Sequence, residues 1–188
     1  MTITRPQGPA GGITVLGRFV PHLMSRGPNA LRPMGGAPAP QVSQPIRVYT
    51  VKLSDIRDED FPDRAVPTGW RYLIDANGPV AVADLKEVGQ GGGPPAFGRL
   101  LRGPIVEDLP RAIDYATRQF SSDTRQYEVR ILEIPAIYKT AVWLHGPEEI
   151  FIPILERGET ATAPPPVHED RQFTSRVVQL ASDKKGRP

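Results

Sequence analysis

The 188-residue chain contains no cysteine, which excludes disulfide bonds, thiolate nucleophiles, iron–sulfur clusters and cysteine-based zinc sites. It also lacks a long apolar run. The best candidate, residues 131–144, is interrupted by Glu133, Pro135 and Lys139, so it falls short of the roughly 18 apolar residues that a membrane helix needs. We therefore expect a soluble protein without membrane contact, and the reducing interior of the cytoplasm fits the absence of cysteine.

Acidic residues are missing from the first 54 positions. This segment contains six basic residues and carries a charge of +6, whereas the 17 basic and 21 acidic residues of the remainder give −4. The sequence thus predicts a basic tail on a mildly acidic body. A nucleic-acid interface would need basic residues clustered on one face or along one element, so nucleic-acid binding is a less favoured hypothesis.

Apolar residues are also scarce, at 39%, while 22 prolines and 18 glycines make up more than a fifth of the chain. This composition indicates extensive unstructured polypeptide around a single core. We expect three parts: a disordered basic tail over residues 1–45, an α+β domain over residues 46–155, and a Pro-rich link with a short helix near 173–182 in residues 156–188.

The middle part shows strand and helix patterns. Residues 46–56 alternate as a strand does, and residues 70–88 read as two strands joined by the hairpin dipeptide Asn77-Gly78. A helix is expected over 108–120, capped by Asp108, and a second hairpin follows. This order predicts an α+β fold, an antiparallel sheet of about five strands with one main helix packed across a face, as in cystatin-like folds.

The most strongly marked segment is "YEVRILEIPAIYKTAVWLHG", residues 127–146. Its apolar residues occupy both faces at several points, which is typical of central strands covered on at least one side. We interpret it as core. The charged positions within it are expected to form a solvated face: Glu128, Arg130, Glu133 and Lys139.

Signs of catalytic or metal chemistry are weak. His22, His145 and His168 lack the i, i+4 or i, i+2 spacing of a shared metal site. The acidic stretch "DIRDED" lacks the glycine and distal glutamate of a calcium loop, and "GQGGGPP" lacks the lysine and hydroxyl of a phosphate-binding loop. We expect no catalytic residues, no metal ligands and no cofactor.

The tail holds one apolar island, "ITVLGRFVPHLM", at residues 13–24. A short apolar segment on a disordered basic leash is typical of a docking motif that orders on a partner. A segment resting on its own domain and an organelle transit peptide are the alternatives. The second expected contact surface is an aromatic patch on the sheet, so the candidate partner-binding residues are Val15, Leu16, Arg18, Phe19, Tyr138, Trp143 and Phe151.

These patterns favour a non-catalytic accessory or adaptor protein that acts through protein contacts, with a protein partner or larger assembly. An edge strand would also allow a homo-oligomer. The alternative hypothesis is a helix-on-sheet pocket that binds or hydrolyses a small molecule, with four polar groups at its mouth: Tyr72, Tyr138, His145 and Glu149.

The segments "VYTVKLSDI", "GWRYLI", "GPIVEDLPRAIDYA" and the pattern YEVRxLxIPAxYxxAxWL resemble a group of small bacterial proteins without an assigned activity. The resemblance covers residues 46 to about 182 and leaves out the tail. It implies a domain without obvious catalytic motifs and brings no site residues to this chain.

Overall fold

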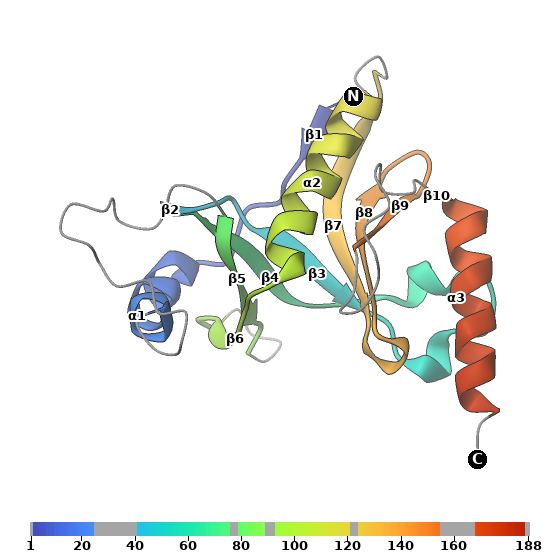
Figure 1. Ribbon diagram of the computed structural model, residues 1–188, viewed down its shortest axis with the longest axis horizontal. Coiled ribbons are helices and arrows are strands. Elements are labelled where there is room, and N and C mark those ends of the chain that lie inside the picture. Colours follow the sequence, from blue (N-terminus) through green and yellow to red (C-terminus); the bar gives the residue numbers. More distant parts are fainter. Residues whose placement is uncertain are drawn as a thin grey trace.

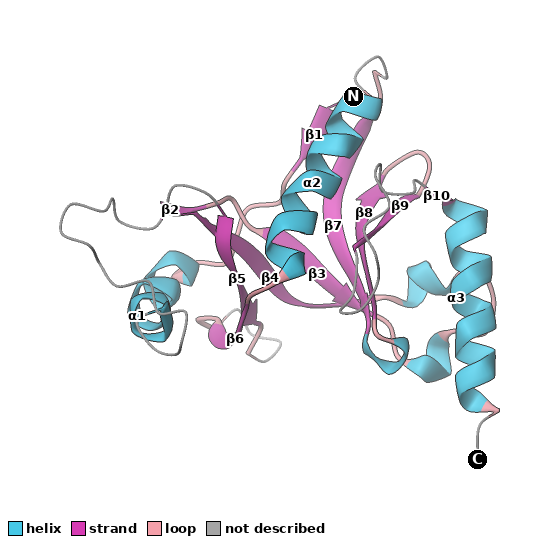
Figure 2. Cartoon of the chain, in the orientation of Figure 1, coloured by secondary structure: helices cyan, strands magenta, loops and turns pink. Residues whose placement is uncertain are grey.

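A single mixed β-sheet organises the chain (Figures 1 and 2). The computed structural model describes residues 2–24, 41–75, 79–88, 93–120, 124–154 and 168–186. Within these residues it contains three helices, α1 (Gly12–Met24), α2 (Pro104–Gln119) and α3 (Asp170–Lys185). The ten strands are β1 (Thr2–Thr4), β2 (Gln41–Val42), β3 (Ile46–Thr50), β4 (Val66–Asp75), β5 (Pro79–Lys86), β6 (Ala96–Leu101), β7 (Gln126–Ile134), β8 (Lys139–His145), β9 (Ile150–Ile154) and β10 (His168–Glu169).

The strand order is β10-β9-β8-β7-β3-β4-β5-β6, and two short strands extend it. β1 runs parallel to the first residues of β7, and β2 runs antiparallel to the end of β4. The central pair β3 and β7 is also parallel, with Val48 opposite Ile131. The remaining pairs are antiparallel.

The predicted antiparallel sheet of about five strands under one helix was wrong, although the α+β class is consistent with the structure. The sheet is larger because β1 and β2 of the expected tail, β10 of the expected link and β6, for which no strand was expected, all join it, and it is mixed because β7 runs parallel to β1 and β3. Thr2–Thr4 and Gln41–Val42 pair with β7 and β4, and the apolar island forms α1. The high proline and glycine content led to the prediction of a disordered tail. Leu16 and Val20, however, lie four residues apart and are both buried, so they form one face of a helix. Residues 25–40 of the predicted tail lie outside the described residues.

Helix α2 packs across one face of the sheet (Figure 1). Its buried residues recur every three or four positions, as an amphipathic helix requires: Val106, Leu109, Ile113 and Ala116. The helix begins four residues before the predicted start. Gly103, at φ +93°, turns the chain, and Pro104 takes the first helical position, where its missing N–H does no harm. Asp108 is therefore inside the helix and not its cap.

The opposite face carries α1 and α3 at its two ends (Figure 1). Helix α1 covers β4 and β5 around Trp70 and Tyr72, and α3 covers β8 and β9 through Phe173 and Val177. None of the helices in the described residues is long and apolar enough to cross a membrane.

Most apolar residues of the marked segment 127–146 are core. The segment forms β7 and β8, joined by the 3₁₀ turn η3 (Pro135–Ile137), and Val129, Ile131 and Ala141–Leu144 are buried. Strands β4 and β5 pair as the predicted hairpin does. Its turn, residues 76–78, and most of the glycine-rich loop, residues 89–92, lie outside the described residues.

Candidate functional site

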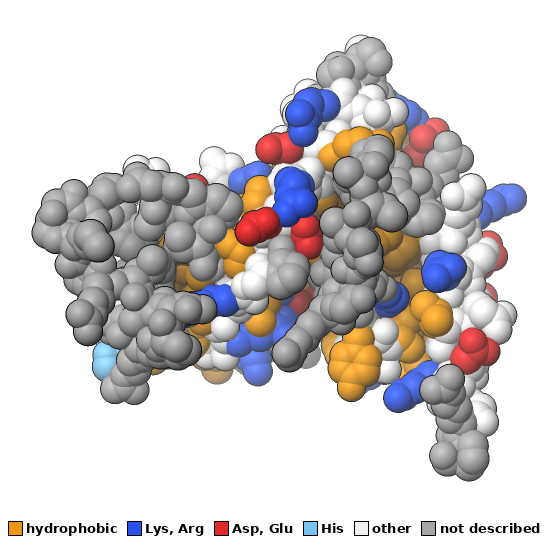
Figure 3. Space-filling model, viewed as in Figure 1, with side chains coloured by type: hydrophobic (Ala, Val, Ile, Leu, Met, Phe, Trp, Pro, Cys, Tyr) orange, Lys and Arg blue, Asp and Glu red, His pale blue; other side chains and the backbone are white. Residues whose placement is uncertain are grey.

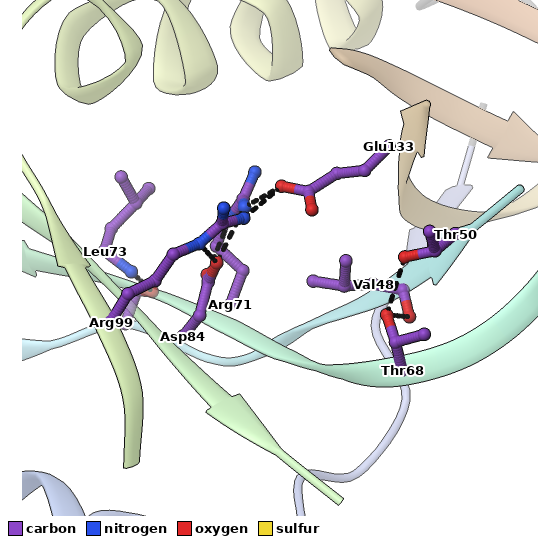
Figure 4. A network of polar contacts seen from close by, with 9 residues as sticks. Val48, Thr50, Thr68, Arg71, Leu73, Asp84, Arg99 and Glu133 are labelled. Atoms are coloured by element: carbon purple, nitrogen blue, oxygen red, sulfur yellow. Dashed lines mark hydrogen bonds and ion pairs between the residues drawn. The ribbon is translucent and has the colours of Figure 1, made fainter. Parts of the chain in front are cut away.

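A buried ion pair joins the two strands of the β4–β5 hairpin on the α2 face (Figure 4). Nε and Nη2 of Arg71 each donate a hydrogen bond to Asp84, at 2.8 Å to Oδ1 and 2.8 Å to Oδ2. The Arg71 side chain is fully buried and that of Asp84 is 10% exposed. This bidentate geometry is the strongest arrangement for a guanidinium and a carboxylate.

Two further charged residues close the network. Arg99 on β6 donates from Nε to Oδ2 of Asp84 at 2.7 Å. Glu133, which extends from β7 across β3, accepts hydrogen bonds from Nη2 of both arginines (Figure 4). Each carboxylate therefore contacts both guanidiniums, and the four formal charges cancel.

Strand register explains why these residues meet. Arg71 lies opposite Asp84 in the β4–β5 pair, and Asp84 lies opposite Arg99 in the β5–β6 pair. Glu133 follows the buried Val129 and Ile131 at two-residue spacing, so it points to the same face. Gly69 lies two residues before Arg71 on β4, and a Cβ atom there would clash with the backbone carbonyl of Leu85, so glycine allows β4 and β5 to approach closely.

The network determines the ionisation of its members. Burial by itself would lower the pKa of Arg71, but the hydrogen bonds and charges of Asp84 and Glu133 outweigh it and raise that pKa. Burial would raise the pKa of Asp84, but Arg71 and Arg99 outweigh it and lower the pKa. The hydrogen bonds and opposite charges within the network thus stabilise the charged forms of Arg71 and Asp84 at neutral pH.

A cleft of about 300 Å³ opens beside the network and is partly open to solvent. Strands β3 to β7 all contribute to its wall. Six polar side chains line it, together with Gly69 and Gly98: Thr50, Thr68, Asp84, Lys86, Arg99 and Glu133. In the space-filling view, basic and acidic side chains lie interspersed with hydrophobic ones on this face (Figure 3).

The two threonines form the end of the cleft away from Arg71. Their hydroxyls lie 2.9 Å apart and share a hydrogen bond (Figure 4). Because a hydroxyl can donate or accept, this pair adapts to either kind of ligand group. The cleft thus offers neutral and charged hydrogen-bonding groups on a wall made of strands, which hold side chains more firmly than a loop does.

The guanidinium groups of Arg71 and Arg99 both keep N–H donors that the network does not use. Nη1 of Arg71 is buried and makes no hydrogen bond to any residue in the described part of the chain. Arg99, whose side chain is 47% exposed, donates to its carboxylate partners only from Nε and Nη2. Lys86 is exposed and forms no ion pair within the described ranges.

The structure separates the predicted partner-binding residues. Leu16, Trp143 and Phe151 are buried, with exposures of 0%, 4% and 0%, so they do not offer a surface to a partner of the folded chain. Phe19 is 46% exposed and stacks on Phe97 of β6. Tyr138, which directly follows η3, is 76% exposed. Val15 and Arg18 lie on α1, half-buried and exposed respectively.

The four residues of the hypothesised pocket do not line the cleft. Tyr72 is buried under α1, and burial raises the pKa of its phenol. His145 and Glu149 do meet, since Nδ1 of His145 lies 2.7 Å from Oε1 of Glu149. Glu149 also accepts a hydrogen bond from Nε1 of Trp143, so it fastens the β8–β9 hairpin. Tyr138 lies between η3 and β8, at the other end of β8 from His145.

Sequence reasoning missed the network. Glu133 was expected on a solvated face, but its side chain is 16% exposed and paired. Two signals could have found it. Counting outwards from a two-residue Asn77-Gly78 turn places Arg71 opposite Asp84, and the two-residue period of β7 places Glu133 in line with Val129 and Ile131.

The described residues contain no group of three or more His, Cys, Asp or Glu side chains that could hold a metal ion. Comparison of the chain with models of protein families, with curated proteins and with solved structures gives no match. The resemblance to small bacterial proteins therefore stays a prediction, and functional reasoning depends on the site itself.

Proposed function

We propose that this protein binds a small polar molecule in the cleft lined by Asp84, Arg99 and Glu133. The observation that supports this proposal is a cleft of about 300 Å³ whose wall includes members of a buried charge network. That volume is at the lower end of the range for small-molecule sites, so the ligand is small. The paired strands fix the charged groups before the ligand arrives, which reduces the entropy cost of binding.

The proposal does not include catalysis. Both carboxylates accept hydrogen bonds from two guanidiniums, and the pKa of Asp84 is lowered. A general acid or base needs a pKa near the working pH, which this environment opposes for Asp84. Binding is therefore the activity that the arrangement supports.

The test is a ligand screen with a variant that fills the cleft. Thr68 is exposed and lines the cleft, so Thr68→Trp should block it without burying new polar groups. Thr14→Trp introduces the same side chain at an exposed position of α1 on the opposite face and is the matched control. The full chain is screened by saturation-transfer NMR against neutral, cationic, zwitterionic and anionic compounds of metabolite size.

The proposal predicts compounds that bind wild type and Thr14→Trp but not Thr68→Trp. Compounds that bind all three proteins equally would locate binding elsewhere. A screen without any binder at millimolar concentration would contradict the proposed function.

A second candidate is protein binding through the outer side of α1. Ile13 and Phe19 are 59% and 46% exposed there, which is high for large apolar side chains. Replacing both with Asp should remove a partner in a pull-down that uses the full chain, and Thr14→Asp on the same helix is the control. An unchanged set of partners in the double variant would contradict this candidate.

A further inference from the structure

We propose that the ligand of the cleft carries a carboxylate or phosphate group, and that Lys86 and Arg99 bind this anion. The inference rests on the proposed function and names the ligand class. Arg99, Asp84 and Glu133 line the cleft, and Arg71 is buried behind them. These four charges balance one another, whereas Lys86, which also lines the cleft, has no ion-pair partner in the described part of the chain. The cleft and the network behind it together therefore carry one excess positive charge.

The placement of Lys86 follows from Gly98. A Cβ atom at Gly98 would lie 3.2 Å from Cγ and 3.5 Å from Cε of Lys86. The lysine stem therefore runs across β6 at the one position where that strand has no side chain. The β5–β6 register shifts at Gly98, between the pairs Leu85–Phe97 and Asp84–Arg99, and Lys86 and Arg99 line the same cleft from these two adjacent strands.

Arg99 has donors to spare. Its Nε and Nη2 hold Asp84 and Glu133, and Nη1 makes no hydrogen bond to a residue of the described ranges. The two ion pairs fix the plane of the guanidinium, so its remaining N–H groups keep a set direction. A guanidinium fork matches the oxygens of a carboxylate or phosphate, and a lysine beside it adds a point charge.

The two carboxylates of the cleft do not cancel this attraction. Asp84 and Glu133 each contact both arginines, so their charge is compensated within the network. The Thr50 and Thr68 hydroxyls supply neutral hydrogen bonds to the rest of the ligand. A small anion whose remaining groups are polar matches the charged and hydroxyl groups that line the cleft.

The test titrates the ¹⁵N-labelled full chain with sodium phosphate and with sodium succinate, at an ionic strength held constant with sodium chloride. Backbone amide signals of Gly69 and Gly98 report on the cleft. At least one anion should give saturable shifts, and the anion that does so distinguishes phosphate from carboxylate. Lys86→Ala should raise its Kd about tenfold, since it removes one charge-assisted contact.

Lys86 suits this test because it is exposed, so its replacement leaves folding unchanged. Lys86→Arg should restore binding. Lys52→Ala, at an exposed lysine outside the cleft, should bind as wild type does. Urea unfolding of each variant separates loss of binding from loss of structure.

Absence of a saturable shift with either anion would overturn the inference, as would equal Kd values for wild type and Lys86→Ala. The ligand screen separates this failure from failure of the proposed function. A neutral or cationic binder that Thr68→Trp blocks would leave the small-molecule function standing and refute the anion. No binder of any class would refute both.

Discussion

Replacing Asp84 with Asn tests whether the buried charge network holds the hairpin and its neighbours together. The substitution keeps the size of the side chain and removes its charge. Two buried N–H donors of Arg71, both at 2.8 Å from Asp84, would then face an amide that can accept only at one atom. Arg99 would lose its 2.7 Å contact as well.

The expected cost is about 3–5 kcal/mol of unfolding free energy, the range for breaking a buried ion pair by removing one partner. The contact with Arg71 contributes most of it, because both side chains are buried. The contact with Arg99 contributes less, because that side chain is 47% exposed and water screens it. A typical domain is stable by only about 5–15 kcal/mol, so the effect is easily measured.

The double variant Arg71→Met, Asp84→Leu is the matched comparison. It removes the buried pair and fills the space with apolar side chains, while Arg99 and Glu133 remain paired. Since apolar replacements of a buried pair are often close to neutral, we expect it to lie within about 2 kcal/mol of wild type. It should therefore be more stable than Asp84→Asn alone.

The assay is urea unfolding followed by tryptophan fluorescence at several pH values. The folded pKa of Asp84 is lowered below its unfolded value of about 3.9. Its stabilisation is fully present above that unfolded pKa and is lost as the pH falls through the folded pKa. The difference between wild type and Asp84→Asn should thus be large at pH 7 and shrink below about pH 4. A loss under about 1 kcal/mol at pH 7, or one that does not depend on pH, would refute the reasoning.

Three further predictions concern backbone conformation and the N-terminal helix, and urea unfolding measures each. Gly103→Ala should cost about 1–2 kcal/mol because φ is +93° at this position, and an unchanged midpoint would contradict the turn geometry. Tyr138→Gly should raise stability by up to about 1 kcal/mol, since Tyr138 has φ +53° and is 76% exposed; a clear loss would mean that its ring contributes packing. Leu16→Ala should cost about 2–5 kcal/mol and Phe19→Ala about 1 kcal/mol, and equal costs would refute the burial of Leu16 between α1 and the sheet.

Local patterns predicted those parts of the fold in which neighbouring residues determine the structure. The Asn77-Gly78 dipeptide predicted the pairing of β4 with β5. The spacing of Phe173, Val177 and Leu180 predicted a short helix near 173–182, where the structure has the longer α3. Both depend on contacts within about 20 residues, where turn geometry and helical periodicity act directly. The interpretation of residues 127–146 as core was sound for the same reason, since its apolar residues require burial whatever covers them.

Long-range pairing could not be predicted in this way. The parallel contacts of β7 with β1 and β3 join segments separated by roughly 80 to 125 residues, and no local signal specifies them. They order Thr2–Thr4, which composition assigned to a disordered tail. The helix formed by the apolar island is likewise stabilised by what it covers, because Leu16 and Val20 are buried in a cluster with residues of β4, β5 and β6.

By itself, the sequence determined the absence of cysteine chemistry, the α+β class, the local hairpin and the charge types available to a site. Only the tertiary structure decided that Arg71, Asp84, Arg99 and Glu133 share one network beside a cleft. The physical reason is the reach of the interactions. Backbone propensities and turn chemistry act between close neighbours in the chain, whereas a charge network depends on the register and order of strands that come together through non-local hydrophobic burial.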